Sequence, residues 1–467
     1  MDPTVLKGSD MPTTLVWFRD DLRLTDNPAL TWAAERGDVV GVVVDETTSR
    51  PLGRAATWWR DRSIAELSER VPLTRAAGDP REIIPKMASE LGAEVVWNRR
   101  YHSTEIDAAV KDACGARSFP GFLLTEPWEM RTGSGMPYRV FTPFYKAVQA
   151  HLAAHPPSVL PAPALEGQVR TAVPPAPHWA EPLAEHNSPG ELAALDRFHA
   201  FLDGLADGAH YSNNDLTPGA TSGLSAHLRF GELSPGYVWA ETVALGEAHP
   251  AAAADAYAFL RQLVWRDFAW HRFYHLPDLH LHNVRSQFDA FDWAWSEHAD
   301  PMAHLYAFAR PEMDGTAEHL EQLAAWQRGE TGIPLIDAGM RELWLTGTMH
   351  NRVRMVVGSW LTKNLGIHWR HGEEWFWDTL VDADVASNPF NWQWVAGSGD
   401  DAAPYFRIFN PITQQEKFDP LGKYVTKWRP EALLPGYPEP MVDVKESRKV
   451  ALAAYEDIKS VSGPQVG

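Results

Sequence analysis

The spacing of hydrophobic residues changes character about a third of the way along the chain. Early in the sequence, short apolar runs are typical of buried strands, at 14–18, 39–46 and 93–98. Between and after them lie stretches with the apolar spacing of helices, at 28–36, 54–70, 81–91 and 103–113. Strands that alternate with helices predict a parallel, doubly wound α/β sheet with a ligand crevice at its carboxyl edge. No G-x-G-x-x-G motif follows these strands, so no dinucleotide fingerprint is predicted there.

A proline-rich segment separates this pattern from the rest of the chain. Residues 151–190 hold nine of the 36 prolines, which predicts an extended segment running over the surface. After about residue 190 the strand patterns fade and amphipathic helical patterns take over. We therefore predict an α/β domain over 1–135, a Pro-rich linker over 136–192 and a mostly α-helical domain over 193–467.

Composition narrows the class of protein. A chain of 467 residues with 45% hydrophobic and 22% charged residues is typical of a soluble protein of two or three domains. No apolar run approaches the roughly 20 residues that span a bilayer, and the first residues lack the features of a signal peptide. The single cysteine, Cys114, excludes an intrachain disulfide and a cysteine-based metal cluster. We expect a cytoplasmic protein with no membrane partner and no metal site.

Charge and tryptophan content point in different directions. A formal net charge of −19 argues against nucleic-acid binding, which depends on Lys and Arg. Residues 341–370, however, carry five basic side chains against one acidic one, Glu342. Of the 21 tryptophans, 14 lie from Trp239 onward, which is more than packing ordinarily requires. The second half of the chain therefore has a local basic surface and a surplus of residues suited to stacking or redox chemistry.

Two motifs in the second half combine polar and aromatic groups. In TSGLSAHLRFGELSP (221–235), Thr221, Ser222 and Ser225 are placed to cap a helix and to present hydroxyl and N–H groups to a phosphate. A plain capped helix is the simpler interpretation. In RQLVWRDFAWHRF (261–273), Trp265 and Arg266 suit a planar or anionic ligand, although an aromatic stripe is more often part of a core.

Two further motifs lie toward the C-terminus. In MHNRVRM (349–355), one turn of a basic helix carries polar, basic and apolar side chains, which suits contact with a phosphate and a base or, alternatively, a solvated face. The segment 382–411 is rich in Asp, Asn, Gly and Trp. Its Asp382 and Asp384 are two residues apart and could both contact one polar ligand. Trp392 and Trp394 flank Gln393 and could line one wall of a binding site.

Together these motifs resemble the DNA photolyase/cryptochrome family from end to end, and most closely a class I cyclobutane pyrimidine dimer photolyase. WFRDDLRLTDNPAL (17–30) is similar to its N-terminal signature. The flavin-domain motifs follow in family order: TSGLS, WRDF, AWQRGETGIPLIDAGM (325–340), MHNRVRM and NWQW…DAAPYFRIFNP. One such motif would be weak evidence, whereas six in order are highly specific.

The resemblance implies an antenna chromophore in the α/β domain and FAD in the helical domain. The antenna would be a deazaflavin or a folate, and folate is disfavoured because His102 stands where a folate-binding member has Glu. Arg354 would pair with Asp382, and Asn388 would face N5 of the flavin. The residues that match cofactor-binding positions are Tyr211, Thr221, Ser222, Gly223, Leu224, Ser225, Arg266, Arg354, Asp382, Ala383, Asp384 and Asn388.

The resemblance also assigns substrate and electron-transfer positions. Trp265 and Trp394 match the walls that hold a flipped dimer, and Gln262 stands where dimer-specific members often have Glu. The remaining positions that match contacts to the dimer or to DNA are Asn351, Arg352, Met355, Arg407 and Gln414. The positions that match the electron-transfer chain are Trp392, Trp369 and, as its distal member, Trp293, with Trp295 as second choice.

The function implied is light-driven repair of UV-damaged DNA by a monomeric enzyme. Reduced FAD passes an electron to the dimer, its two cyclobutane C–C bonds split, and the electron returns. A cryptochrome light sensor is the first alternative, and a long C-terminal extension, which this chain lacks, would favour it. A (6-4) photolyase is disfavoured because MHNRVRM lacks the expected histidine pair, although Thr348 also departs from a usual Trp. A light-independent flavoprotein is disfavoured by the Trp369 and Trp392 pair.

Overall fold

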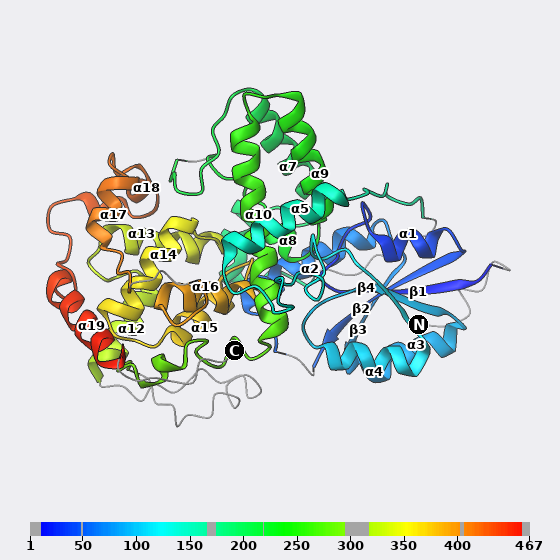
Figure 1. The fold of residues 1–467 in the computed structure, drawn as a ribbon, viewed down its shortest axis with the longest axis horizontal. Coiled ribbons are helices and arrows are strands. Elements are labelled where there is room, and N and C mark those ends of the chain that lie inside the picture. Colours follow the sequence, from blue (N-terminus) through cyan, green and yellow to red (C-terminus); the bar gives the residue numbers. More distant parts are fainter. Residues whose placement is uncertain are drawn as a thin grey trace.

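A parallel sheet forms the N-terminal part of the molecule. The computed structural model describes residues 11–47, 50–165, 174–217, 219–294, 317–401 and 406–459. Within these ranges the strands form one parallel sheet in the order β3-β2-β1-β4-β5, on the right in Figure 1. Their bounds are β1 (Thr13–Phe18), β2 (Asp38–Glu46), β3 (Leu73–Gly78), β4 (Glu94–Asn98) and β5 (Arg117–Phe119).

Helices cover both faces of this sheet, as the alternation of buried side chains requires. Val16 and Phe18 of β1 pack in one cluster with α1 (Pro28–Ala34) and α2 (Arg54–Ser68). Leu15 and Trp17 of the same strand point to the other face, toward α3 (Pro80–Leu91) and α4 (Thr104–Cys114). The predicted doubly wound sheet is confirmed.

The sequence analysis missed two edge strands. β3 has the sequence LTRAAG, in which only Leu73 is a large apolar residue, and β5 spans only three residues. Both lie at the edges of the sheet, where burial is incomplete, so neither needs the continuous apolar run that identifies a buried strand.

The predicted linker contains a helix. α5 (Phe141–Ala154) buries Phe141, Phe144, Val148 and Leu152, so its part of the 136–192 linker is not extended as predicted. The reason is that the dense run of prolines begins only at Pro156, after α5 has ended, while the earlier Pro143 lies in the first turn of α5, where proline is tolerated. Residues 156–165 then have no regular structure, and short turns at η2 (His178–Ala180) and α6 (Glu181–His186) follow. The domain boundaries at 135 and 192 stay predictions.

The rest of the described chain is helical. α10 (Ala253–His275) is the longest of these helices and packs against α5, α9 and α16. In Figure 1, α7, α9 and α10 form the upper part of the molecule, and α12 to α16 lie to the left. The bounds are α7 (Glu191–Ala206), α8 (Ser225–Arg229), α9 (Pro235–Ala248), η3 (Ser286–Ala290), α12 (Ala317–Arg328), α13 (Pro334–Thr346), α14 (Asn351–Ser359), η4 (Trp360–Asn364), α15 (Trp369–Thr379), α16 (Ser387–Ala396), α17 (Pro411–Phe418), α18 (Lys423–Trp428), η5 (Pro430–Leu433) and α19 (Val444–Lys459).

Buried ion pairs join the sheet to the helical part. Arg229 at the end of α8 donates to Asp20 after β1 at 2.6 Å. Burial opposes ionisation of Asp20, yet Arg229 and His102 hold the pKa of that carboxyl far below its usual range. Gly231 packs so closely on the Asp20 carbonyl that a Cβ would lie 2.1 Å from the oxygen, and its φ is +62°. Only glycine suits this contact, which fixes the two parts against each other.

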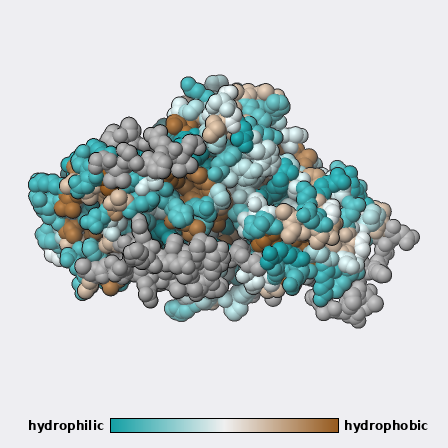
Figure 2. Space-filling view, turned by 60° about the horizontal axis from the view of Figure 1, so that its bottom comes forward, coloured by the Kyte–Doolittle hydropathy of each residue, from teal (hydrophilic) through white to brown (hydrophobic). Residues whose placement is uncertain are grey.

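The described residues were compared with the requirements for a membrane-spanning helix and for a metal site. None of the helices in the described ranges combines the length and the apolar character that crossing a bilayer requires. In the same ranges, no group of three or more His, Cys, Asp and Glu side chains is placed to hold a metal ion. Hydrophobic residues gather near the middle of the face shown in Figure 2, and most of the other coloured residues on this face are hydrophilic.

Candidate active site

A cavity of about 790 Å³ lies in the helical part of the molecule. Its walls come from the turn before α8 and from α10, α14, α15 and α16, together with the segment that joins α15 to α16. All twelve residues predicted to bind the cofactor line it, and so do Gln262, Trp265, Asn351, Arg352, Met355, Trp394 and Trp392. A volume of this size suits a ligand with more than one ring system.

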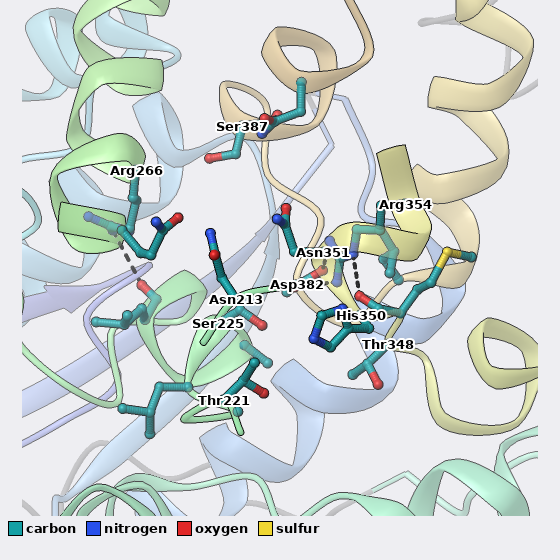
Figure 3. Close-up of a pocket in the computed structure, with 18 of the residues that line it drawn as sticks. Asn213, Thr221, Ser225, Arg266, Thr348, His350, Asn351, Arg354, Asp382 and Ser387 are labelled. Atoms are coloured by element: carbon teal, nitrogen blue, oxygen red, sulfur yellow. Dashed lines mark hydrogen bonds and ion pairs between the residues drawn. The ribbon is translucent and has the colours of Figure 1, made fainter. Parts of the chain in front are cut away.

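The TSGLS turn presents free hydroxyl groups to the cavity. α8 begins at Ser225, and no side chain caps its first turn, so the predicted capping role of Thr221, Ser222 and Ser225 is wrong. Among the described residues these three hydroxyls have no hydrogen-bond partner, and Figure 3 shows Thr221 and Ser225 along one wall. Thr221 and Ser225 are exposed and Ser222 is half-buried, so their hydroxyls can bond to water or to a ligand that replaces it. Tyr211 lines the same wall, and burial raises the pKa of its phenol.

The predicted ion pair between Arg354 and Asp382 is present on the facing wall. The guanidinium of Arg354 donates to both carboxylate oxygens of Asp382, at 3.2 and 2.9 Å, and its Nε donates to the Met349 carbonyl at 2.7 Å. Asp382 is 6% exposed and Arg354 28% exposed, so removal of either charge would leave the other poorly solvated. In Figure 3, Arg354 and Arg266 stand on opposite sides of the cavity.

Asp384 and Arg266 are also held in place by the backbone. One carboxylate oxygen of Asp384 accepts from the Ala386 and Ser387 N–H groups, which starts α16. Arg266 of α10 donates to the Phe122 carbonyl at 2.9 Å and to the Leu228 carbonyl at 3.3 Å. Arg266 therefore joins α10, α8 and the loop after β5 at the cavity wall.

Asn388 presents only its carbonyl oxygen to the cavity. Its Nδ2 donates to the Glu373 carbonyl at 3.0 Å and to Glu373 Oε1 at 2.8 Å. Glu373 in turn accepts two hydrogen bonds from Arg50, a residue 323 positions earlier in the chain. Because both amide hydrogens are used, a ligand beside Asn388 meets a hydrogen-bond acceptor.

The mouth of the cavity is basic and aromatic. Arg352 of α14 donates to Asn214 and lies 4.4 Å above the ring of Phe418 on α17. Burial and then the nearby Arg407 lower the pKa of Arg352, because both desolvation and a like charge disfavour the protonated guanidinium. Arg407 and Gln414 do not line the cavity, and Gln414 lies on α17 beside this rim.

Of the three tryptophans predicted for electron transfer, Trp392 lines the cavity, and Trp369 and Trp293 are buried outside its lining. Trp392 of α16 lines it and packs on Gly372 of α15, where a Cβ would meet the indole at 2.1 Å. Trp369, one turn earlier on α15, is fully buried, and the His368 ring lies between it and Trp293, with centroid distances of 5.4 and 4.7 Å. The second-choice Trp295 lies outside the described residues.

Comparisons with known proteins agree with this arrangement. Residues 14–164 match the family model described as DNA photolyase, and residues 259–435 match the one described as the FAD binding domain of DNA photolyase. A deoxyribodipyrimidine photo-lyase of Agrobacterium fabrum is 42% identical over 96% of this chain and 98% of its own length. The chain belongs to the DNA photolyase/cryptochrome family.

Solved structures of the photolyase family refine this assignment. A class III photolyase of Agrobacterium tumefaciens has a TM-score of 0.81 and 41% identity, with 98% of this chain and 99% of that chain covered. The class I prediction is therefore not confirmed, whereas the family prediction is. A photolyase of Sulfolobus tokodaii solved with two FAD molecules has a TM-score of 0.71 and 26% identity, over 95% of this chain and all of that one. Cryptochrome-1 of Arabidopsis thaliana is 31% identical over 90% of this chain and 63% of its own length.

The residues present fit FAD, the cofactor of this photolyase domain. The cavity combines unpartnered hydroxyls, two guanidinium groups and the Asn388 carbonyl oxygen, which together suit phosphate, ribose and a ring with N–H donors. Gly358 of α14 also lines the cavity, and a Cβ there would touch the Trp392 indole at 3.4 Å.

Sequence reasoning missed two contributors to this photolyase site. His350 lies inside MHNRVRM, where its Nδ1 accepts from the Arg352 N–H at 3.2 Å and starts α14. Burial, with Arg354 and Arg352 nearby, lowers the pKa of His350 to about 4, so it lines the cavity as a neutral group. Its place in a recognised motif could have identified it. Arg50 carries no local signal, because only the fold brings it to Glu373.

Proposed function

We propose that this protein repairs cyclobutane pyrimidine dimers in DNA under blue light. One observation carries the proposal: a single cavity combines the polar groups suited to FAD with two tryptophans, Trp265 and Trp394, and opens beside the basic rim of Arg352 and Arg407. Reduced FAD, held by Arg354, Asp382 and Asn388, would supply the electron that splits the two C–C bonds of the dimer and would recover it afterwards. Two relatives named deoxyribodipyrimidine photo-lyase, which are 42% and 34% identical to this chain, support the assignment.

In this proposal the protein's own residues bind and orient the cofactor and the dimer. Arg354 and Asp382 hold the cofactor end of the cavity, and Asn388 offers its carbonyl oxygen to the flavin ring. Trp265 and Trp394 stack on the two faces of a flipped dimer, and Gln262 hydrogen-bonds its base edge. Asn351, Met355 and the basic rim contact the floor of the dimer and the DNA backbone. No proton transfer is required, so the protein contributes position and a water-poor site.

The buried tryptophans restore the cofactor and play no part in repair. Trp392, Trp369 and Trp293 lead away from the cavity, so they serve to bring an electron inward to oxidised flavin. Trp392→Phe keeps a ring against Gly372 but removes the readily oxidised indole. We expect this variant to retain FAD and, once chemically reduced, to repair dimers at a near wild-type yield, while photoreduction from oxidised FAD is strongly slowed. Loss of both activities would make Trp392 a packing residue.

The decisive experiment is repair of an oligo(dT) that contains cyclobutane dimers. Reduced protein and oligonucleotide are mixed in the dark and then exposed to blue light, and recovery of the thymine absorbance band is followed. We expect recovery only in the light and only with protein. Absence of recovery in a protein that retains FAD would favour a cryptochrome-type sensor, which the similarity to plant cryptochrome supports as the second candidate.

Three further features complete the proposal. A second, light-harvesting chromophore of deazaflavin or folate type would widen the range of usable light, and the Sulfolobus tokodaii structure with two FAD molecules supports a second site. The enzyme acts as a monomer on UV-damaged DNA. It works in the cytoplasm, where its single cysteine, Cys114, stays reduced.

A further inference from the structure

The first of the two aromatic walls is supported by a residue of α5. The ring of Phe141 stacks face to face on Trp265, with a centroid distance of 3.6 Å and an interplanar angle of 5°. The Arg261 guanidinium lies 4.9 Å from the Phe141 centroid, and Tyr145 stacks beside it at 5.7 Å. Phe141 therefore determines how far the Trp265 indole can move away from the cavity.

The second wall is held by an unusual backbone conformation. The indole N–H of Trp394 donates to the Asp401 carbonyl at 3.0 Å. Asp401 has a φ of +52°, in the left-handed region that residues other than glycine enter rarely and at a cost in free energy. Such strain persists only where the surroundings enforce it, and it is common where geometry matters for function.

A hydrogen bond joins the supports of the two walls. Oδ2 of Asp401 accepts from the backbone N–H of Phe141 at 3.3 Å. The neighbouring Asp400, 6% exposed, accepts from Arg272 at 2.8 Å and from Arg139 at 3.1 Å. Arg272 also donates to the Tyr138 carbonyl at 3.1 Å. Residues 138–141 and 400–401 are thus held together at three points although they lie far apart in the sequence.

We propose that Phe141 and Asp401 form a brace that sets the spacing and tilt of the two aromatic walls, and that this brace is what makes the cavity selective for a pyrimidine dimer. They are positioning residues, since neither lines the cavity and each acts through a tryptophan. The inference rests on the proposed function and names part of its substrate recognition. A fixed spacing removes the cost of ordering two indole rings when the substrate enters.

The test compares binding of two oligonucleotides that differ only in one cyclobutane dimer. The readout is the ratio of the two Kd values, measured by fluorescence anisotropy in the dark with flavin-loaded protein. Phe141→Leu removes the stack but keeps the backbone N–H. Asp401→Gly keeps the positive φ and the carbonyl bonded to Trp394 but loses the acceptor for Phe141. We expect each variant to reduce the preference for the dimer by on the order of tenfold.

Three controls separate positioning from simple stability. Phe144→Leu removes another buried ring of α5, one that packs on Phe268 and His271 rather than on Trp265, and should leave the ratio unchanged. Asp401→Asn keeps an oxygen acceptor and tolerates a positive φ, and Phe141→Tyr keeps the stack, so both should behave as wild type. The flavin-to-protein absorbance ratio reports folding in every sample, and a reduced active fraction would not alter a ratio of Kd values.

The outcomes distinguish the brace from the function on which it rests. Wild-type protein that does not prefer the dimer would overturn the proposed function together with the brace. A wild-type preference that survives in both Phe141→Leu and Asp401→Gly, to the level of Phe144→Leu, would overturn the brace alone. Loss of preference in Asp401→Asn as large as in Asp401→Gly would also overturn it, because the acceptor oxygen is retained there.

Discussion

The carboxyl edge of the sheet and the cavity of the helical part both carry many polar groups, but those at the sheet edge bond within the chain, whereas several of those in the cavity do not. At the sheet edge, Asp21 accepts from the Arg19 N–H at 2.7 Å and from Asn98 Nδ2 at 2.8 Å. Arg100 lies between Glu46 and Asp107, at 2.6 and 3.0 Å. The side chains that follow β1 and β4 thus find partners within the chain, at the edge where the sheet predicts a ligand crevice.

The cavity contains the contrasting case. The hydroxyls of Thr221, Ser222 and Ser225 have no partner among the described residues, and Asn388 leaves its carbonyl oxygen free toward the cavity. Thr221 and Ser225 are exposed and Ser222 is half-buried, so water can bond to these hydroxyls and a ligand that enters the cavity can replace that water. The comparison teaches that polar character alone does not identify a site; what identifies it is polar character without an internal partner.

The largest expected effect comes from removing one charge in each region. Asp382→Ala should leave Arg354 without its partner and weaken retention of FAD by about 3–5 kcal/mol, with most of the fold intact. Asp21→Ala at the sheet edge should instead lower the free energy of unfolding and leave the flavin content of the folded fraction unchanged. Flavin absorbance per mole of protein and urea unfolding of both variants are the measurements. Full flavin occupancy in Asp382→Ala would contradict the comparison.

The next effect concerns Asp267, a buried carboxylate with one oxygen bonded within the chain and the other without a hydrogen-bond partner among the described residues. Its Oδ2 accepts from the Leu124 N–H at 2.7 Å, whereas Oδ1 has no hydrogen-bond partner among the described residues and only Arg266 nearby, at 3.5 Å. Burial raises its pKa to about 7. The folded protein therefore binds a proton that the unfolded chain has released above about pH 4, and the free energy of unfolding falls as the pH rises from about 4 to about 7.

Asp267→Asn removes this titration but keeps an oxygen for the Leu124 N–H. The variant should gain stability relative to wild type as the pH rises through that window, by on the order of 2 kcal/mol, and the difference should be constant above it. Thermal unfolding of both proteins between pH 5 and pH 8 measures the difference, in which all other titrating groups cancel. Parallel curves would show that Asp267 is ionised throughout and belongs with the paired groups of the sheet edge.

The sequence predicted those parts of the molecule that repeat a pattern or a motif. Buried strands and amphipathic helices were predicted because their apolar spacing is regular. The strand β3 was missed because an edge strand needs only one buried side. The helix α5 was missed because the high proline density of the following segment was extended to residues that precede it. The cavity residues were found because they lie in motifs. Arg50, Phe141 and Asp401 were not, because their roles depend on contacts between segments hundreds of residues apart.

A smaller effect is expected where the cavity wall would meet substrate. Trp265→Ala should weaken binding of dimer-containing DNA by about 1–3 kcal/mol and leave undamaged DNA almost unaffected, because stacking on a flipped base requires that the base leave the helix. Phe141, which stacks on Trp265 at 3.6 Å, remains as a poorer wall and limits the loss. Competition binding with the two oligonucleotides gives the result. Equal losses on both would place the damaged base elsewhere in the cavity.

The smallest effect is expected at the basic rim, where a substitution should weaken binding of damaged and undamaged DNA equally. Arg352 stands beside Arg407, and burial together with this like charge lowers the pKa of Arg352. A DNA phosphate at this position would neutralise one charge and release about one counterion. Arg352→Ala should therefore reduce the slope of log Kd against log salt concentration by about one, equally for damaged and undamaged DNA. Arg341→Ala, which removes an exposed arginine paired with Glu431 at 3.0 Å, is the matched control and should leave the slope unchanged. A loss confined to damaged DNA would mean that Arg352 contacts the dimer itself, and the rim would then belong to the polar groups of the cavity rather than to the electrostatic surface around it.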